Sequence, residues 1–128
     1  MFVHTSIRTS NMEKTIDFYS RFFGLKVLKR MEIKQTNAEI AFLQDLKGEG
    51  CTLEVTFYRS QMKFSQPEYE ERVFDHLGFE VKDMNQTLAA MRKENVKVTD
   101  EPFTLNSKTT IAFIEDPDGT LIELIEHK

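Results

Sequence analysis

Residues 111–126 read Ile-Ala-Phe-Ile-Glu-Asp-Pro-Asp-Gly-Thr-Leu-Ile-Glu-Leu-Ile-Glu, two apolar runs joined by Asp-Pro-Asp-Gly at positions 116–119. Proline presets a φ of about −65° and glycine tolerates a positive φ, so these four residues predict a tight turn. The runs on either side, 109–114 and 121–126, predict two strands. Glu123 interrupts the second run, where burying an unpaired acid costs several kcal/mol. A metal ion or a strong hydrogen-bond donor would offset that cost.

The chain resembles itself at an offset of about half its length. At one offset His4 aligns with His76, and at a slightly smaller offset Leu53-Glu54-Val55 aligns with Ile122-Glu123-Leu124. Each half therefore begins with a strand that carries histidine and ends with a strand that carries glutamate. Such self-similarity indicates two copies of one supersecondary unit.

Local patterns fill in the two halves. Asn11 and Asp83 are plausible N-caps, and Gly24 is placed like a helix C′ glycine. The predicted strands cover 2–9, 25–31, 38–43, 52–58, 77–81, 96–99, 109–114 and 121–126. The predicted inward helix positions are Met12, Ile16, Tyr19 and Phe23, then Met84, Leu88 and Met91. We therefore predict an α+β fold of two tandem βαβββ modules, whose curved mixed sheets surround a concave site.

The domain organisation follows from length and repeat. A chain of 128 residues fits one domain. Its first module covers about 1–58 and its second about 75–128. The segment 59–74 is polar and contains Pro67, which indicates a linker, with room for a helical turn. Neither module is large enough to make the site alone.

Composition excludes several classes of protein. The 17 Lys and Arg against 21 Asp and Glu give a net charge of −4, a poor match to nucleic acid or an anionic membrane. The single cysteine, Cys51, allows no intramolecular disulfide, and we expect it to be a buried small residue at a strand start. No apolar run reaches the roughly 18 residues of a membrane span. The first five residues lack signal-peptide features, so we expect a cytoplasmic protein.

Four residues form the candidate site: His4, Glu54, His76 and Glu123. Two imidazoles and two carboxylates can fill four positions on a zinc, nickel, cobalt, manganese or iron(II) ion and leave two for substrate. Taken alone, the residues are more typical of exposed strand or rim positions than of ligands, but their repeat-related placement favours a shared role. The third histidine, His127, lies in a charged tail and is expected to be solvated.

The chain resembles the vicinal oxygen chelate superfamily, and within it the bacterial glyoxalase I (lactoylglutathione lyase) group. Residues 111–126 are similar to the C-terminal signature of that family, and His4-Thr5, Arg8, 16–19 and 23–25 match its start. The resemblance implies a homodimer whose metal sites are shared between chains. The implied ligands of one divalent ion per site, nickel, zinc or cobalt, are His4, Glu54, His76 and Glu123.

The resemblance also implies a reaction. The hemithioacetal of an α-ketoaldehyde such as methylglyoxal with a thiol, glutathione or similar, would become a 2-hydroxyacyl thioester through a metal-bound enediolate. Glu123 would be the base, with Glu54 on the opposite face. Three-ligand members of the superfamily do not usually have a carboxylate at the position of Glu54, so Glu54 favours the glyoxalase type.

Arg8, Tyr58, Arg59 and Lys108 are the expected substrate-binding residues. Arg8 matches an arginine that contacts a glutathione carboxylate in the family. Tyr58 stands where asparagine is usual, and residues 105–108 replace a Lys-Gly-Gly loop. These departures leave the thiol open. The alternatives are a small-molecule-binding or resistance protein, an epimerase or a thiol transferase of the same superfamily.

Overall fold

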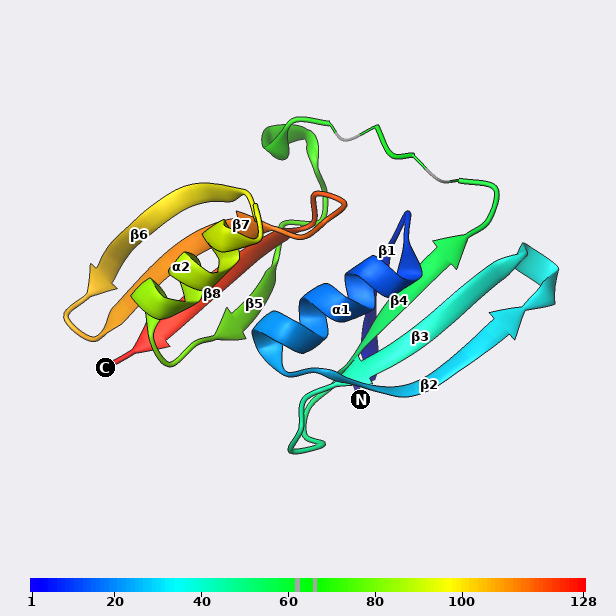
Figure 1. The fold of residues 1–128 in the computed structure, drawn as a ribbon, viewed down its shortest axis with the longest axis horizontal. Coiled ribbons are helices and arrows are strands. Elements are labelled where there is room, and N and C mark those ends of the chain that lie inside the picture. The colour runs from blue at the N-terminus through cyan, green and yellow to red at the C-terminus, as the bar shows by residue number, and fades with distance from the viewer. Residues whose placement is uncertain (62, 66) are drawn as a thin grey trace. The chain divides into compact units, whose positions relative to one another are not determined.

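The computed structural model of the chain describes residues 1–61, 63–65 and 67–128. The chain forms two compact units, Met1–Ser65 and Gln66–Lys128. In its described residues each unit carries one α-helix and four strands in the order βαβββ (Figure 1). The predicted α+β class with two such modules is therefore confirmed. The boundary between the units lies within the segment that the sequence indicates as a linker.

The first unit contains a four-stranded mixed sheet in the order β1-β4-β3-β2. β1 and β4 run parallel, and the other neighbours are antiparallel. Figure 1 shows the helix lying across one face of this sheet. The elements are β1 (His4–Arg8), α1 (Met12–Phe23), β2 (Lys26–Ile33), β3 (Ala38–Gln44) and β4 (Thr52–Tyr58).

The second unit repeats this arrangement with the order β5-β8-β7-β6, and β5 and β8 run parallel. Its helix again covers one face of its sheet (Figure 1). The elements are β5 (Leu77–Glu80), α2 (Met84–Lys93), β6 (Val98–Asn106), β7 (Thr109–Glu115) and β8 (Leu121–His127).

Helix ends follow the predicted caps. The Asn11 side chain accepts a hydrogen bond from the backbone N–H of Lys14, and Asp83 does the same for Gln86. Each bond satisfies one of the free N–H groups of a helix's first turn. Gly24 ends α1 with a φ of 67°, a left-handed conformation that favours glycine. The capping residues thus set where both helices begin and where α1 ends.

The strand residues alternate between a buried and an open face. Val55 is completely buried in β4, as are Ile122 and Leu124 in β8. Glu54 and Glu123, their sequence neighbours, point to the opposite face because side chains alternate along a strand. The core of each unit lies between sheet and helix, and the two glutamates lie on the open face.

Two expectations about buried residues are wrong. Cys51 is exposed, because it precedes β4 directly after the turn that contains Gly48 and Gly50. In α1, Thr15 is buried while Ile16 is only half-buried. The Thr15 hydroxyl lies 2.7 Å from the hydroxyl of Thr9, so hydrogen bonding allows a polar side chain inside. In α2 the buried residues are the predicted ones, Met84, Leu88 and Met91.

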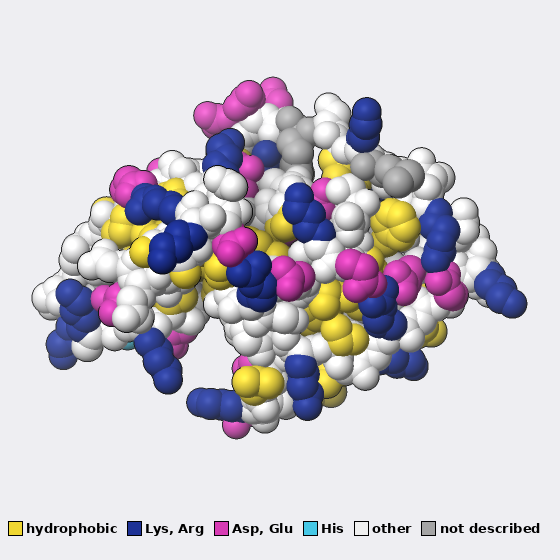
Figure 2. Space-filling model, in the orientation of Figure 1, with side chains coloured by type: hydrophobic (Ala, Val, Ile, Leu, Met, Phe, Trp, Pro, Cys, Tyr) yellow, Lys and Arg dark blue, Asp and Glu magenta, His cyan; other side chains and the backbone are white. Residues whose placement is uncertain are grey.

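The surface carries charges of both signs. In Figure 2, basic and acidic side chains are interspersed across the face in view. One example is Arg30, which binds Glu13 and Glu39 at 2.7 and 2.9 Å. Neither helix in the described part of the chain is long and apolar enough to span a membrane.

Candidate functional site

In the first unit, a histidine and a glutamate meet on adjacent parallel strands. His4 is the first residue of β1, and Glu54 lies in the middle of β4. The Nε2 atom of His4 is 3.8 Å from Oε2 of Glu54. The His4 ring packs edge-on against Phe42 of β3, with ring centroids 5.7 Å apart. The Glu54 side chain is 17% exposed, so its carboxylate is shielded but still reachable.

Two hydroxyl groups bind the other oxygen of that carboxylate. Ser6 Oγ donates to Oε1 of Glu54 at 2.8 Å, and Thr56 Oγ1 donates to the same oxygen at 3.1 Å. The strand register explains the first bond, because Ser6 of β1 lies directly opposite Glu54 of β4. The second follows from alternation, which places Thr56 on the same face as Glu54. Oε2 therefore remains for His4.

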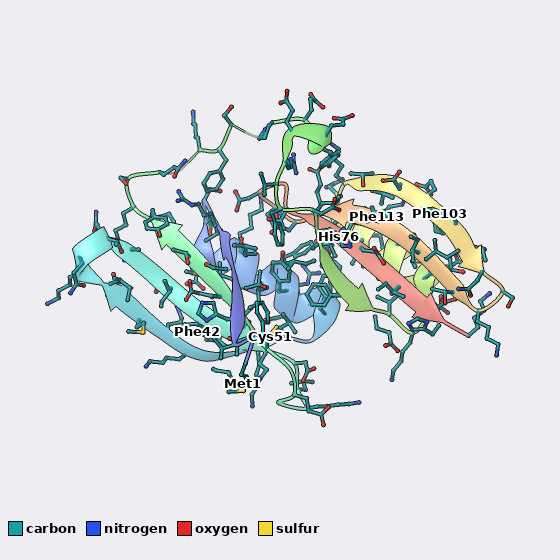
Figure 3. All side chains as sticks on the ribbon, turned by 180° about the vertical axis from the view of Figure 1, so that it is seen from behind. Met1, Phe42, Cys51, His76, Phe103 and Phe113 are labelled. Atoms are coloured by element: carbon teal, nitrogen blue, oxygen red, sulfur yellow. The ribbon has the colours of Figure 1, made fainter. Side chains whose placement is uncertain are left out.

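The second unit brings together the corresponding pair. The Nε2 atom of His76 lies 3.0 Å from Oε2 of Glu123, and its Nδ1 atom lies 2.6 Å from Oδ1 of Asp75. The ring also packs edge-on against Phe113 of β7, with centroids 5.5 Å apart (Figure 3). His76 thus lies between two carboxylates, with an aromatic wall beside it.

A pocket of about 230 Å³ opens beside this pair within the second unit. Its lining is mixed, with acids, an arginine and apolar side chains: Tyr69, Arg72, Asp75, Asp100, Phe113 and Leu121. Tyr69 belongs to a single 3₁₀ turn, Tyr69–Glu71, and its hydroxyl donates to Glu115. Arg72 packs over the Tyr69 ring at 4.3 Å and donates to the carbonyl of Gly119 at 3.0 Å. These contacts fasten the turn to the sheet and close one side of the pocket.

The environment of Tyr69 changes its titration. Burial, followed by the hydrogen bond to Glu115, raises the pKa of the Tyr69 hydroxyl from 10.0 to about 12. The phenol is therefore a stable hydrogen-bond donor throughout the physiological range.

The predicted substrate-binding residues fall into separate places. The Arg8 guanidinium lies 4.6 Å from the centroid of the Tyr58 ring and donates to Gln61 at 2.5 Å. Arg59 instead binds Glu32 at 2.6 Å, and this bond raises the pKa of Arg59 and lowers that of Glu32. Lys108 is exposed in the turn between β6 and β7, in the other unit.

Sequence reasoning missed the residues around the His76–Glu123 pair. Asp75 could have been noticed, since a carboxylate next to a candidate metal-ligating histidine is a common orienting partner. Tyr69 and Arg72 lie in the segment predicted as a linker, and Phe113 looks like an ordinary strand residue. Only the folded chain shows that they line one pocket.

The arrangement offers imidazole nitrogen and carboxylate oxygen in each unit. Within the residues that the structure describes, no three or more His, Cys, Asp or Glu side chains are grouped so as to hold a metal ion. Each unit by itself therefore supplies one His–Glu pair. The chemistry of such pairs suits borderline divalent ions.

Comparison with known proteins identifies the family. The sequence profile of the Glyoxalase/Bleomycin resistance protein/Dioxygenase superfamily matches residues 1–124. A probable lactoylglutathione lyase of Vibrio cholerae serotype O1 is 31% identical, and the match covers 98% of this chain and 90% of the relative. The lactoylglutathione lyase of Escherichia coli O157:H7 is also 31% identical over 98% of this chain and 92% of its own length.

A solved structure shows the same fold. The trypanothione-dependent glyoxalase I of Leishmania major superposes with a TM-score of 0.82 at 28% identity, covering 98% of this chain and 86% of that one. With relatives of this identity over nearly its full length, the chain is an enzyme of the same type. It belongs to the Glyoxalase/Bleomycin resistance protein/Dioxygenase superfamily.

Proposed function

We propose that this enzyme is a metal-dependent lyase of the glyoxalase I type. Its substrate would be the hemithioacetal of methylglyoxal and a thiol, and its product a 2-hydroxyacyl thioester. The observation that carries the proposal is the repeated His–Glu pair. In one unit Nε2 of His4 faces a carboxylate oxygen of Glu54, and in the other Nε2 of His76 faces a carboxylate oxygen of Glu123. The likeness to lactoylglutathione lyases supports the reaction.

The donor set fits a divalent cation. Two neutral imidazoles and two carboxylates provide ligands that nickel, zinc and cobalt accept. We propose that His4, Glu54, His76 and Glu123 bind one such ion, in a homodimer whose sites draw on both chains. When bound, the ion would hold two neighbouring substrate oxygens and stabilise the negative charge that develops on them.

The side chains of this chain would transfer the proton, bind the substrate and limit the access of water. Glu123 would take the proton from the carbon that bears the hydroxyl and return it to the adjacent carbon, so that no net proton is consumed. Arg8, held against Tyr58, would bind a carboxylate of the thiol. Phe113 and Phe42, beside the two histidines, would limit the access of water.

The thiol is a separate question. A neighbour of this fold is described as trypanothione-dependent, and the lactoylglutathione lyases point to glutathione. We infer glutathione as the first candidate, because Arg8 provides a binding group for a carboxylate. Tyr58 and Lys108 are further candidates for contact with the substrate.

The test is direct. Purified protein is stripped of metal, reloaded separately with nickel, cobalt or zinc, and given methylglyoxal with glutathione or another cellular thiol. Formation of the thioester is followed by its ultraviolet absorbance. We expect turnover with at least one metal and none with the stripped protein. Absence of thioester with every metal and thiol contradicts the proposal and favours a binding protein, which a retained ligand would then identify.

A further inference from the structure

The two glutamates of the candidate site have different surroundings, although they occupy corresponding strands. In the first unit, Ser6 and Thr56 both donate to Oε1 of Glu54, at 2.8 and 3.1 Å. Their own hydroxyl oxygens are 3.1 Å apart. With both protons directed at Glu54, the two hydroxyls lie side by side without a hydrogen bond between them. Thr56 is only 5% exposed, which protects one of the two bonds from competing water.

The second unit has the same strand register without the hydroxyls. Gly78 of β5 lies opposite Glu123 of β8, just as Ser6 lies opposite Glu54. Two residues beyond Glu123 the chain has Ile125, where Thr56 stands two residues beyond Glu54. Glycine and isoleucine have no side-chain donor. The repeat therefore keeps both carboxylates but gives the hydroxyl pair to one of them.

This difference has a mechanical consequence. Two hydrogen bonds on one oxygen restrict rotation of the Glu54 carboxylate and direct its other oxygen, Oε2, toward His4. A carboxylate that acts as a base must turn toward the substrate carbon and back. Glu123 lacks this restraint, because neither Gly78 nor Ile125 can bind it through a side-chain hydroxyl. Its Oε2 does lie 3.0 Å from Nε2 of His76, just as Oε2 of Glu54 faces His4, so the hydroxyl pair is what distinguishes the two glutamates.

On the basis of the proposed function, we propose that Ser6 and Thr56 are positioning residues that hold Glu54 as a fixed metal ligand. Proton transfer is thereby confined to Glu123. The two modules have diverged in this respect, one toward holding the ion and the other toward reacting with substrate.

Removal of the hydroxyls is the first test. Ser6→Ala, Thr56→Val and the double variant are made in the full chain, with Thr52→Val as the control. The Thr52 hydroxyl lies on the same strand but is directed at the backbone carbonyl of Val3, at 3.4 Å. Zinc affinity is measured by competition with a chromophoric chelator, and circular dichroism checks the fold.

We expect the double variant to bind zinc about 10-fold to 100-fold more weakly, the usual cost of losing an outer partner of a metal ligand. Each single variant should lose less, and Thr52→Val should bind like the wild type. A folded double variant with wild-type zinc affinity overturns the proposal. Because the measurement does not depend on turnover, it is valid whatever the reaction proves to be.

Transfer of the hydroxyl to the second unit is the complementary test. A Cβ atom at Gly78 would meet the Cδ1 atom of Ile125 at 3.8 Å, an ordinary van der Waals contact, so Gly78→Ser and Gly78→Ala should both fold. Only serine can donate to Glu123. We expect Gly78→Ser to lower kcat about tenfold, with KM and zinc affinity kept, while Gly78→Ala keeps wild-type kcat.

The outcomes separate the two proposals. Equal kcat for Gly78→Ser and Gly78→Ala overturns the idea that freedom of Glu123 matters. A wild-type chain without any lyase activity sinks the proposed function instead, and the zinc affinities of the Ser6 and Thr56 variants still decide whether these residues hold Glu54.

Discussion

The Nε2 atom of His76 lies 3.0 Å from Oε2 of Glu123, while the other ring nitrogen faces Asp75 at 2.6 Å. A neutral imidazole carries one ring proton, and a nitrogen that binds a metal must present its lone pair. In the proposed metal-bound state, a proton on Nδ1, donated to Asp75, would leave the lone pair of Nε2 for the metal. We therefore expect Asp75 to favour the tautomer of His76 that the proposed metal site requires.

Asp75→Ala should weaken zinc binding by about 10-fold to 100-fold, because His76 loses the partner that fixes its ring. Nitrogen-15 NMR of the imidazole should show a smaller share of the Nδ1-protonated tautomer. Glu80→Gln, which removes an exposed acid at the end of β5, the strand that follows His76, is the control. Unchanged zinc affinity and tautomer in Asp75→Ala would show that the contact has no orienting role.

Glu123→Gln and Glu54→Gln should fail in different ways. Loss of the base should lower kcat about 10²-fold to 10⁴-fold with the fold intact. Glu54→Gln, which removes the proposed fixed ligand, should mainly weaken zinc binding. Thioester formation and chelator competition measure the two effects separately. Full activity in Glu123→Gln would refute its role as the base.

Arg8→Ala should raise KM for the glutathione adduct by about 10-fold to 100-fold, as expected for a lost hydrogen bond to a charged group. Arg59→Ala should change KM less, because Arg59 is already bound to Glu32 at 2.6 Å. Steady-state kinetics with glutathione, and with a thiol that lacks carboxylates, test this difference. Equal effects of Arg8→Ala on both thiols would exclude carboxylate recognition.

Tyr69 should make stability fall in strong base. Its pKa rises from 10.0 to about 12 in the folded chain, so the folded state holds this proton more tightly than the unfolded state. The resulting stabilisation is complete below pH 10 and is lost as the pH approaches about 12. Urea unfolding between pH 10 and about 12 should show that the free energy of unfolding declines less steeply with pH for Tyr69→Phe than for the wild type. Parallel declines would contradict the raised pKa.

The sequence predicted the architecture because the relevant signals are local. Asn11 and Asp83 cap their helices, and β4 occupies the predicted range. β6 is longer than predicted and includes Pro102, which normally argues against a strand. As β6 is an edge strand, a missing N–H there breaks no required ladder bond.

The candidate site was predictable only in part. Glu54 and Glu123 stand out because they are acids beside buried aliphatic neighbours. Ser6 gives no such signal, since its importance depends on lying opposite Glu54, a residue far away in the sequence. The role of the pocket residue Tyr69 cannot be read from the sequence for the same reason: its hydrogen bond to Glu115 joins two residues that are far apart in the chain. Strand register, and the route by which the segment carrying Tyr69 reaches the sheet, are set by the tertiary structure and cannot be seen in the local sequence.

The prediction of a single domain can be tested through Leu88, which is 2% exposed in the core of the second unit. Leu88→Ala should lower the free energy of unfolding by about 2–5 kcal/mol, through lost burial and the cavity that remains. Leu105→Ala, at a 59% exposed position, is the control. If the chain unfolds as one domain, amide hydrogen exchange in β3 and β4 of the first unit should accelerate as much as exchange in β8. Acceleration limited to the second unit would show that the modules unfold separately and that the single-domain prediction is wrong.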